Sequence, residues 1–195
     1  VDHHFLTVIK DGAGKFRILN GNDGGVAVTK SSISPGEAEG DFILGRTSGY
    51  NTSQAYGADK VKGSHRYISG FQDNGTWLSP SSEVASSSTD YSFAIGGDGF
   101  EVITHWNNSD TMIGGAQNNY LFRTLDGGTE WYYVPTNEMR EFGPFITRLS
   151  TSYQDPDVLY AISQKGVHKS TNFGGSWKKS EIIDNWGFWS GSDVE

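Results

Sequence analysis

Short apolar runs alternate along the whole chain with turns rich in glycine, asparagine and aspartate. Four windows repeat one order: an apolar strand, a polar turn, a second short strand, and then serine or threonine. The windows are 16–30, 65–79, 110–124 and 157–171, so their starts are 49, 45 and 47 residues apart. A period in the forties is typical of repeat arrays, and each window predicts the two central strands of one unit.

A further apolar run flanks each window on either side. The preceding runs are 5–9, 53–58, 102–106 and 145–149, and the following ones are 41–44, a stretch near Val84, 131–134 and 177–179. Four strands in each of four units predict an all-β fold: a β-propeller, or part of one, with four blades of four antiparallel strands each. The predicted blades are 1–47, 48–98, 99–142 and 143–181, and residues 182–195 start a further unit or form a tail. No convincing helical pattern is present.

Two turns share a motif. Residues 124–131 read T-L-D-G-G-T-E-W and residues 170–177 read S-T-N-F-G-G-S-W, and they start 46 residues apart. The Asp or Asn can accept hydrogen bonds from backbone N–H groups of its own turn, glycine allows positive φ, and Trp buries an apolar face. The motif is therefore predicted to be structural, at Thr124, Asp126, Gly128, Trp131, Ser170, Asn172, Gly174 and Trp177. In the first two units it has decayed.

A second group of polar, glycine-rich turns supplies the candidate chemistry. These turns are 2–4 (D-H-H), 22–25 (N-D-G-G), 72–75 (Q-D-N-G), 96–99 (G-G-D-G) and 117–119 (Q-N-N). Turns at equivalent places in successive units share one face of a propeller, where binding sites are commonly built. Alternation along a strand predicts that one of the two histidines points inward and the other outward. The candidate ligand-binding residues are His3, His4, Gln72, Asp73, Asn74 and Trp77.

Composition argues against several classes of function. The 195 residues contain no cysteine, which excludes thiol chemistry and cysteine-ligated zinc, and the formal charge of −8 argues against binding to nucleic acid. The apolar runs are too short to span a bilayer. No metal site or cofactor is predicted, although a calcium ion held by aspartate and backbone carbonyls on a turn stays open. Because the chain starts at Val1, we expect a processed protein or a piece of a longer one.

The two turn motifs resemble the Asp-box of BNR repeats. Together with D-H-H, N-D-G-G-V, Q-D-N-G-T and G-G-D-G, they resemble the Asp-box propellers of large secreted proteins, which include xyloglucanase-type glycoside hydrolases and sortilin-type domains. The resemblance covers nearly the whole chain. It implies a secreted or cell-surface location and a larger ring, with the remaining blades or domains in a longer parent chain. It also implies that the Asp-boxes lie away from an active site.

In the xyloglucanase-type enzymes, two aspartates on opposite sides of a cleft act as general acid and general base with inversion. By this resemblance Asp23 is the best match to one of them and Asp98 is a weaker match to the other. The enzyme motif has an extra apolar residue between the Asp and the glycine pair, and its partner aspartate comes from a separate propeller that is absent here. The arginine cluster and catalytic tyrosine of sialidases are not visible either.

Two interpretations of these aspartates stay open. Asp-Gly and Asn-Gly pairs are also the usual residues of tight hairpin turns, so Asp23, Asp73 and Asp98 are either turn residues or contacts to a bound molecule. The preferred function is a secreted propeller module that binds glycans or proteins, because only half of an enzyme site can be identified. The alternative is an inverting glycoside hydrolase acting on a polysaccharide such as a β-glucan. The expected partner is therefore a polysaccharide or a protein, and not nucleic acid.

Overall fold

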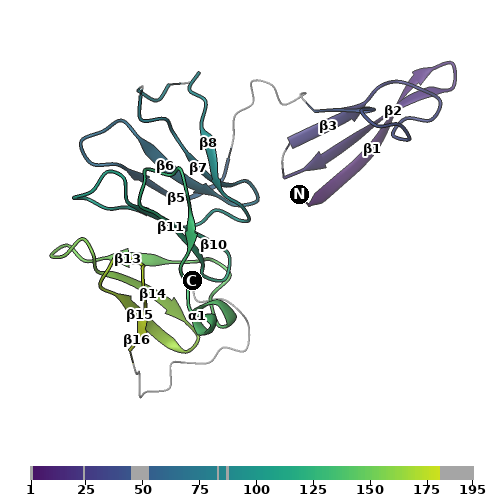
Figure 1. The fold of residues 1–195 in the computed structure, drawn as a ribbon. Coiled ribbons are helices and arrows are strands. Elements are labelled where there is room, and N and C mark those ends of the chain that lie inside the picture. Colours follow the sequence, from purple (N-terminus) through teal and green to yellow (C-terminus); the bar gives the residue numbers. More distant parts are fainter. Residues whose placement is uncertain (1, 24, 45–52, 83, 87, 181–195) are drawn as a thin grey trace. The chain divides into compact units, whose positions relative to one another are not determined.

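The computed structural model describes residues 2–23, 25–44, 53–82, 84–86 and 88–180. The chain divides into two compact units, Val1–Ser53 and Gln54–Glu195 (Figure 1). The described residues form four separate four-stranded antiparallel sheets, in each of which the strands lie in chain order. The predicted all-β fold with four strands per repeat is therefore confirmed. The predicted tail at 182–195 lies outside the described residues.

The first unit holds one sheet. Its strands are β1 (His3–Gly12), β2 (Lys15–Asn22), β3 (Gly25–Thr29) and β4 (Phe42–Leu44). The register of β1 against β2 shifts between His3 and Phe5. Because of this irregularity, the strict alternation predicted for His3 and His4 does not apply at the start of β1.

The second unit holds three sheets. The first consists of β5 (Ala55–Lys60), β6 (Tyr67–Phe71), β7 (Gly75–Leu78) and β8 (Ser92–Ile95). The second consists of β9 (Val102–Thr104), β10 (Met112–Ala116), β11 (Tyr120–Thr124) and β12 (Tyr132–Tyr133). The third consists of β13 (Leu149–Thr151), β14 (Leu159–Ser163), β15 (Gly166–Ser170) and β16 (Lys178–Lys179).

Two outer strands differ in position from their predictions. Val84 lies in an exposed loop, and the fourth strand of its sheet is β8, which pairs with β7. The run at 145–149 contributes only Leu149 to β13. The helix α1 (Asn137–Glu141) precedes that run, and its five residues are too few to show a helical period. Its start is capped by Thr136, whose hydroxyl accepts the backbone N–H of Met139 at 3.2 Å.

The core of the second unit lies between its sheets. One apolar cluster joins the first sheet to the second through Val102 and Met112, and the other joins the second to the third through Ile103 and Ile113. Consecutive residues of β9 and β10 thus point to opposite sides, as strand alternation requires. Two strands of the middle sheet, β9 and β10, are buried on both faces, so neither has an exposed polar face.

The antiparallel order decides which connections lie together. Consecutive strands of each sheet are antiparallel neighbours, so the chain reverses direction at every connection. The first and third hairpin turns of a sheet therefore lie at one end of it. The second hairpin turn and the connection to the next sheet lie at the other end. In the second unit, the end with the second hairpin turns and the connections between sheets contains residues 72–74, 96–101, 117–119 and 134–148. We call it the polar end. Both motif turns, 124–131 and 170–177, lie at the opposite end.

Candidate functional site

Asp98 is the central residue of the polar end. Its carboxylate oxygen Oδ1 accepts the backbone N–H of Asp73 at 2.9 Å, and its own backbone N–H donates to Oε1 of Gln117 at 2.9 Å. Asp73 belongs to the turn between β6 and β7, and Gln117 to the turn between β10 and β11. The structure therefore brings together three of the turns that the sequence marked as candidate sites.

Glycine is required where these turns touch. Gly97 has a φ of +88°, and a Cβ added there would lie 2.7 Å from Oε1 of Gln117. A Cβ at Gly99 would overlap backbone atoms of Phe71 and Gly75. The sequence G-G-D-G thus allows the chain between two sheets to lie directly against both neighbouring turns.

The other predicted ligand residues of this region shape the β6–β7 hairpin. The side-chain amide of Asn74 donates to the carbonyl of Gln72 at 3.1 Å, and Nε1 of Trp77 donates to the carbonyl of Asn74 at 2.7 Å. Trp77 also meets the ring of Phe93 edge-on, with centroids 5.3 Å apart. These contacts fix the hairpin and leave Trp77 half-buried.

A hollow of about 380 Å³ lies beside Asp98. Its lining is formed by Gly96, Gly97, Gln117, Tyr120, Phe122 and Arg140. The guanidinium of Arg140 stands over the ring of Tyr120, 4.5 Å from its centroid. Tyr120 also contacts Phe122 and Tyr133, at centroid distances of 5.0 and 5.1 Å. This arrangement combines aromatic rings with polar groups, which is the usual composition of a small-molecule site.

Sequence reasoning missed Tyr120 and Arg140. Arg140 lies in α1, a helix that the apolar pattern did not reveal, and 20 residues separate it from Tyr120. The available signals were local: a threonine cap at 136 and a tyrosine directly after the Q-N-N turn. In that turn Asn118 and Asn119 both have a φ of +55°, the left-handed conformation that asparagine tolerates best after glycine.

Asp23 and the two histidines lie in the first unit. One Asp23 oxygen accepts the backbone N–H of Asp2 at 3.0 Å, and the other contacts Nε2 of His4. The hydrogen bond from His4, aided by that from Asp2, lowers the pKa of Asp23. His3 meets a different partner, because its Nδ1 lies 2.9 Å from Oδ1 of Asn20. Asp23 is thus held in its ionised form.

Glu101 is a further carboxyl that sequence reasoning did not identify. It precedes β9, and burial raises its pKa, although Arg148 stands 3.6 Å away and opposes the shift. A carboxyl with a raised pKa is suited to donate a proton. Its pairing with Arg148 across two sheets also gives it a plain structural role.

The motif turns at the opposite end have closely similar hydrogen bonds. Oδ1 of Asp126 accepts the backbone N–H groups of Thr129 and Glu130, each at 3.0 Å, and these bonds, led by that from Glu130, lower the pKa of Asp126. Oδ1 of Asn172 accepts the backbone N–H of Ser176 at 2.8 Å. Each first hydroxyl accepts a glycine N–H, Thr124 from Gly128 at 2.9 Å and Ser170 from Gly174 at 2.8 Å. The two aromatic ends of the motif, Trp131 and Trp177, pack against the two core clusters.

An arginine from the preceding sheet contacts each motif turn. Arg66 donates to the carbonyl of Gly127, and Arg123 donates to the carbonyl of Asn172 at 2.8 Å. Each turn therefore joins two sheets as well as closing its own hairpin. These contacts give the motif residues a structural role.

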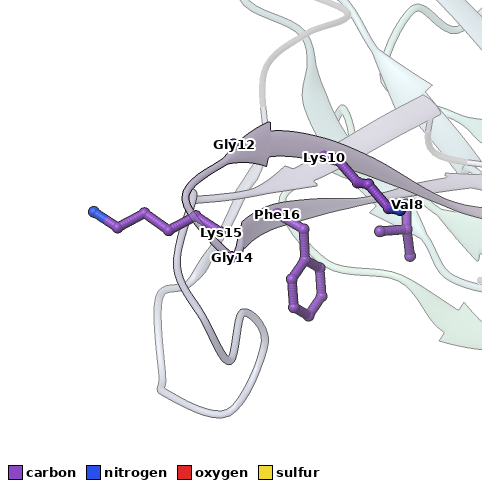
Figure 2. Close-up of a pocket in the computed structure, with 6 residues that line it drawn as sticks. All are labelled: Val8, Lys10, Gly12, Gly14, Lys15 and Phe16. Atoms are coloured by element: carbon purple, nitrogen blue, oxygen red, sulfur yellow. The ribbon is translucent and has the colours of Figure 1, made fainter.

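A second hollow, of about 490 Å³, lies on the β1–β2 hairpin of the first unit and is lined by Val8, Lys10, Gly12, Gly14, Lys15 and Phe16. Val8 and Phe16 project from the same side of the hairpin, and Lys15 points away from it (Figure 2). The described residues of this lining include no carboxylate and no aromatic pair. It therefore offers less recognition chemistry than the hollow beside Asp98.

Among the described residues, no cluster of three or more His, Asp or Glu side chains has the arrangement of a metal site. Within the same ranges of the chain, no helix has the length and apolar character needed to cross a bilayer.

Comparison with known proteins identifies the fold. No family model matches the sequence, and no curated protein matches it either. An ancestral GH74 enzyme superposes with a TM-score of 0.55 at 17% identity, over 93% of this chain and 24% of the enzyme. A GH74 enzyme from Niastella koreensis gives a TM-score of 0.40 at 14% identity, over 91% of this chain and 38% of that one. This chain spans about a quarter of the ancestral enzyme, and the likeness shows that it has the fold of part of a β-propeller.

Proposed function

We propose that this chain is a glycan-binding segment of a larger, secreted β-propeller protein, and that it binds through the polar end of its second unit. One observation carries the proposal: the hydrogen-bonded group Asp73, Asp98 and Gln117 lies next to a hollow lined by Tyr120. Sugar rings present apolar C–H faces and many hydroxyls, so a site for them needs an aromatic surface beside fixed polar groups.

The comparison with solved structures supports the same class of ligand. The ancestral enzyme that shares this fold belongs to the GH74 enzymes, which are propeller-type glycoside hydrolases. At 17% identity the likeness concerns the backbone, and the argument for glycans rests on the side chains of the polar end. The secreted location is proposed from the resemblance of the turn motifs to those of secreted propellers.

Binding of soluble polysaccharides by affinity electrophoresis tests this function. We expect at least one polysaccharide of a panel of β-glucans, xyloglucan, pectins and alginate to retard the 195-residue chain. Asp98→Ala removes the acceptor of the Asp73 N–H and should weaken that retardation at least several-fold. The matched control is Asp90→Ala, an exposed aspartate in a loop of the same unit. Migration unaffected by every member of the panel would refute the proposal.

The second candidate function is an inverting glycoside hydrolase, and the geometry of Asp23 favours it. An inverting enzyme needs one carboxylate that stays ionised as the general base. The hydrogen bonds from His4 and Asp2 keep Asp23 in that state.

Hydrolysis is measured by incubating the protein with β-glucans and xyloglucan and following new reducing ends. If the chain is an enzyme, Asp23→Asn should lower the rate by at least 100-fold, because the amide cannot accept a proton from water. Asp11→Asn, a change of the same chemistry in the same unit, is the control. An activity that survives Asp23→Asn undiminished excludes Asp23 as the base.

A further inference from the structure

Two of the residues that line the hollow beside Asp98, Gly96 and Gly97, are glycines without side chains. A Cβ added at Gly97 would lie 2.7 Å from Oε1 of Gln117. Tyr120 and Phe122 of β11 also line the hollow, together with Arg140 of α1. Glycines beside aromatic rings leave room for a ring-shaped ligand to approach the backbone.

The polar groups of this hollow are mainly donors. Oε1 of Gln117 already accepts the backbone N–H of Asp98, so the amide of Gln117 offers its N–H groups to a ligand. Arg140 carries five N–H donors. One of them, on Nη1, donates to the carbonyl of Asn118 at 3.2 Å. Donors therefore remain on both side chains.

Among the described residues that line the hollow, Arg140 is the only one with a charged side chain. Its guanidinium lies over Tyr120, and stacking of this kind holds the planar donor fork in place. A guanidinium held in this way is suited to bind a carboxylate through two parallel hydrogen bonds. In the described part of the chain, no carboxylate lines the hollow to occupy that position.

From these groups we infer that the hollow binds a hexuronate, a sugar ring that carries a carboxylate, within an acidic polysaccharide. The carboxylate pairs with Arg140, an oxygen acceptor of the sugar takes the amide N–H of Gln117, and the ring lies next to Gly96 and Gly97 and against Tyr120 and Phe122. The inference rests on the proposed glycan binding and specifies its ligand. The net charge of −8 opposes general adsorption of anions, so binding has to come from this local site.

Calorimetric titration with trigalacturonate and trimannuronate tests the inference on the 195-residue chain. The methyl ester of trigalacturonate is the matched ligand, because it keeps the ring and removes the charge. We expect an acidic trimer to bind, and the ester to bind roughly 10- to 100-fold more weakly, as expected for loss of a charge-assisted pair. Arg140→Lys keeps the charge without the fork and should weaken binding by about 10-fold.

Arg148→Gln is the control variant, because it removes an arginine of the same unit that does not line the hollow. It should leave binding of the acidic trimer unchanged, whereas Arg140→Gln should abolish it. If circular dichroism shows that Arg140→Gln does not fold, two other measurements test the inference. These are the comparison of acid and ester binding on the unaltered chain and the binding of the acidic trimer to Arg140→Lys.

The outcomes separate this inference from the proposed function. If the acid and the ester bind equally well, or if only neutral glycans bind, the inference that the ligand is a hexuronate is refuted. The proposed glycan binding is not refuted by either result. If Arg140→Gln still binds the acidic trimer, Arg140 does not hold the carboxylate and the hollow is not the binding site. Failure of both acidic trimers to bind overturns the inference, and failure of the whole polysaccharide panel refutes the proposed function as well.

Discussion

Replacing Gly174 by alanine tests how the second motif turn joins two sheets. Gly174 has a φ of +78°, and a Cβ there would lie 2.6 Å from Cδ1 of Ile113, a fully buried residue of the preceding sheet. Gly63 provides a matched control in the same unit, because its φ is +74° and a Cβ there would have nothing within 4 Å. Both substitutions place an alanine in a left-handed backbone conformation, but only Gly174→Ala also brings its Cβ too close to Ile113.

The expected magnitudes follow from these two effects. An L-residue in the left-handed conformation costs roughly 1–2 kcal/mol relative to glycine, and both variants incur this cost. Forcing a methyl group into a packed core costs about 1–3 kcal/mol more, and only Gly174→Ala incurs it. We therefore expect a loss of about 1–2 kcal/mol in the free energy of unfolding for Gly63→Ala and about 2–5 kcal/mol for Gly174→Ala.

Urea denaturation followed by tryptophan fluorescence measures these losses, because all six tryptophans lie beyond residue 54 and report on the second unit alone. The variant Ile113→Val removes the overlapping Cδ1 atom and by itself costs about 0.5–1.5 kcal/mol. In that background Gly174→Ala should cost no more than Gly63→Ala, which gives a coupling of about 1–3 kcal/mol. Equal losses for Gly174→Ala and Gly63→Ala in the unaltered chain would refute the reasoning.

Three further predictions concern single side chains. Arg123→Met should destabilise the second unit by about 1.5–3 kcal/mol in the same denaturation assay, because the carbonyl of Asn172 loses a charged donor; a loss below 0.5 kcal/mol would contradict the bridging role. Burial lowers the pKa of His168 in the folded chain below 6.5. As the pH falls, the unfolded chain therefore takes up this proton before the folded chain does. The free energy of unfolding should carry the full contribution of this group above pH 6.5 and lose it as the pH falls towards the folded-state pKa. Denaturation of His168→Gln at several pH values checks this prediction, because the variant should no longer show that decline. The carboxyl of Asp23 should titrate below 3.8 in carbon-detected NMR, and His4→Ala should raise the midpoint; an unchanged midpoint would exclude His4 as the main cause.

Much of the fold could be predicted because its signals are local. The alternation in 159–163 and the turn chemistry of 170–177 are readable from neighbouring residues, and the sheets appear where the repeat placed them. The strand expected near Val84 was misplaced because the serine-rich loop delays the return of the chain to Ser92. The helix α1 escaped because five residues make little more than one turn.

The candidate site was predictable only in part. The turns that contain Asp73 and Asp98 were marked by their composition, and their meeting follows from the up-and-down order of the strands. The hollow was not predictable, since Tyr120 and Arg140 belong to different elements and carry no shared pattern in the sequence.

The sequence by itself determined the number of strands, the repeat and the chemistry of the turns, because hairpin geometry depends on residues that are adjacent in the chain. Tertiary structure alone decided that Gln117 meets Asp98, that Arg140 covers Tyr120 and that His4 holds Asp23 ionised. Each of these contacts joins residues about 20 positions apart in the chain. The first two depend on how sheets and loops pack together, and the third depends on the register of β1 against β2; none is encoded by a local pattern.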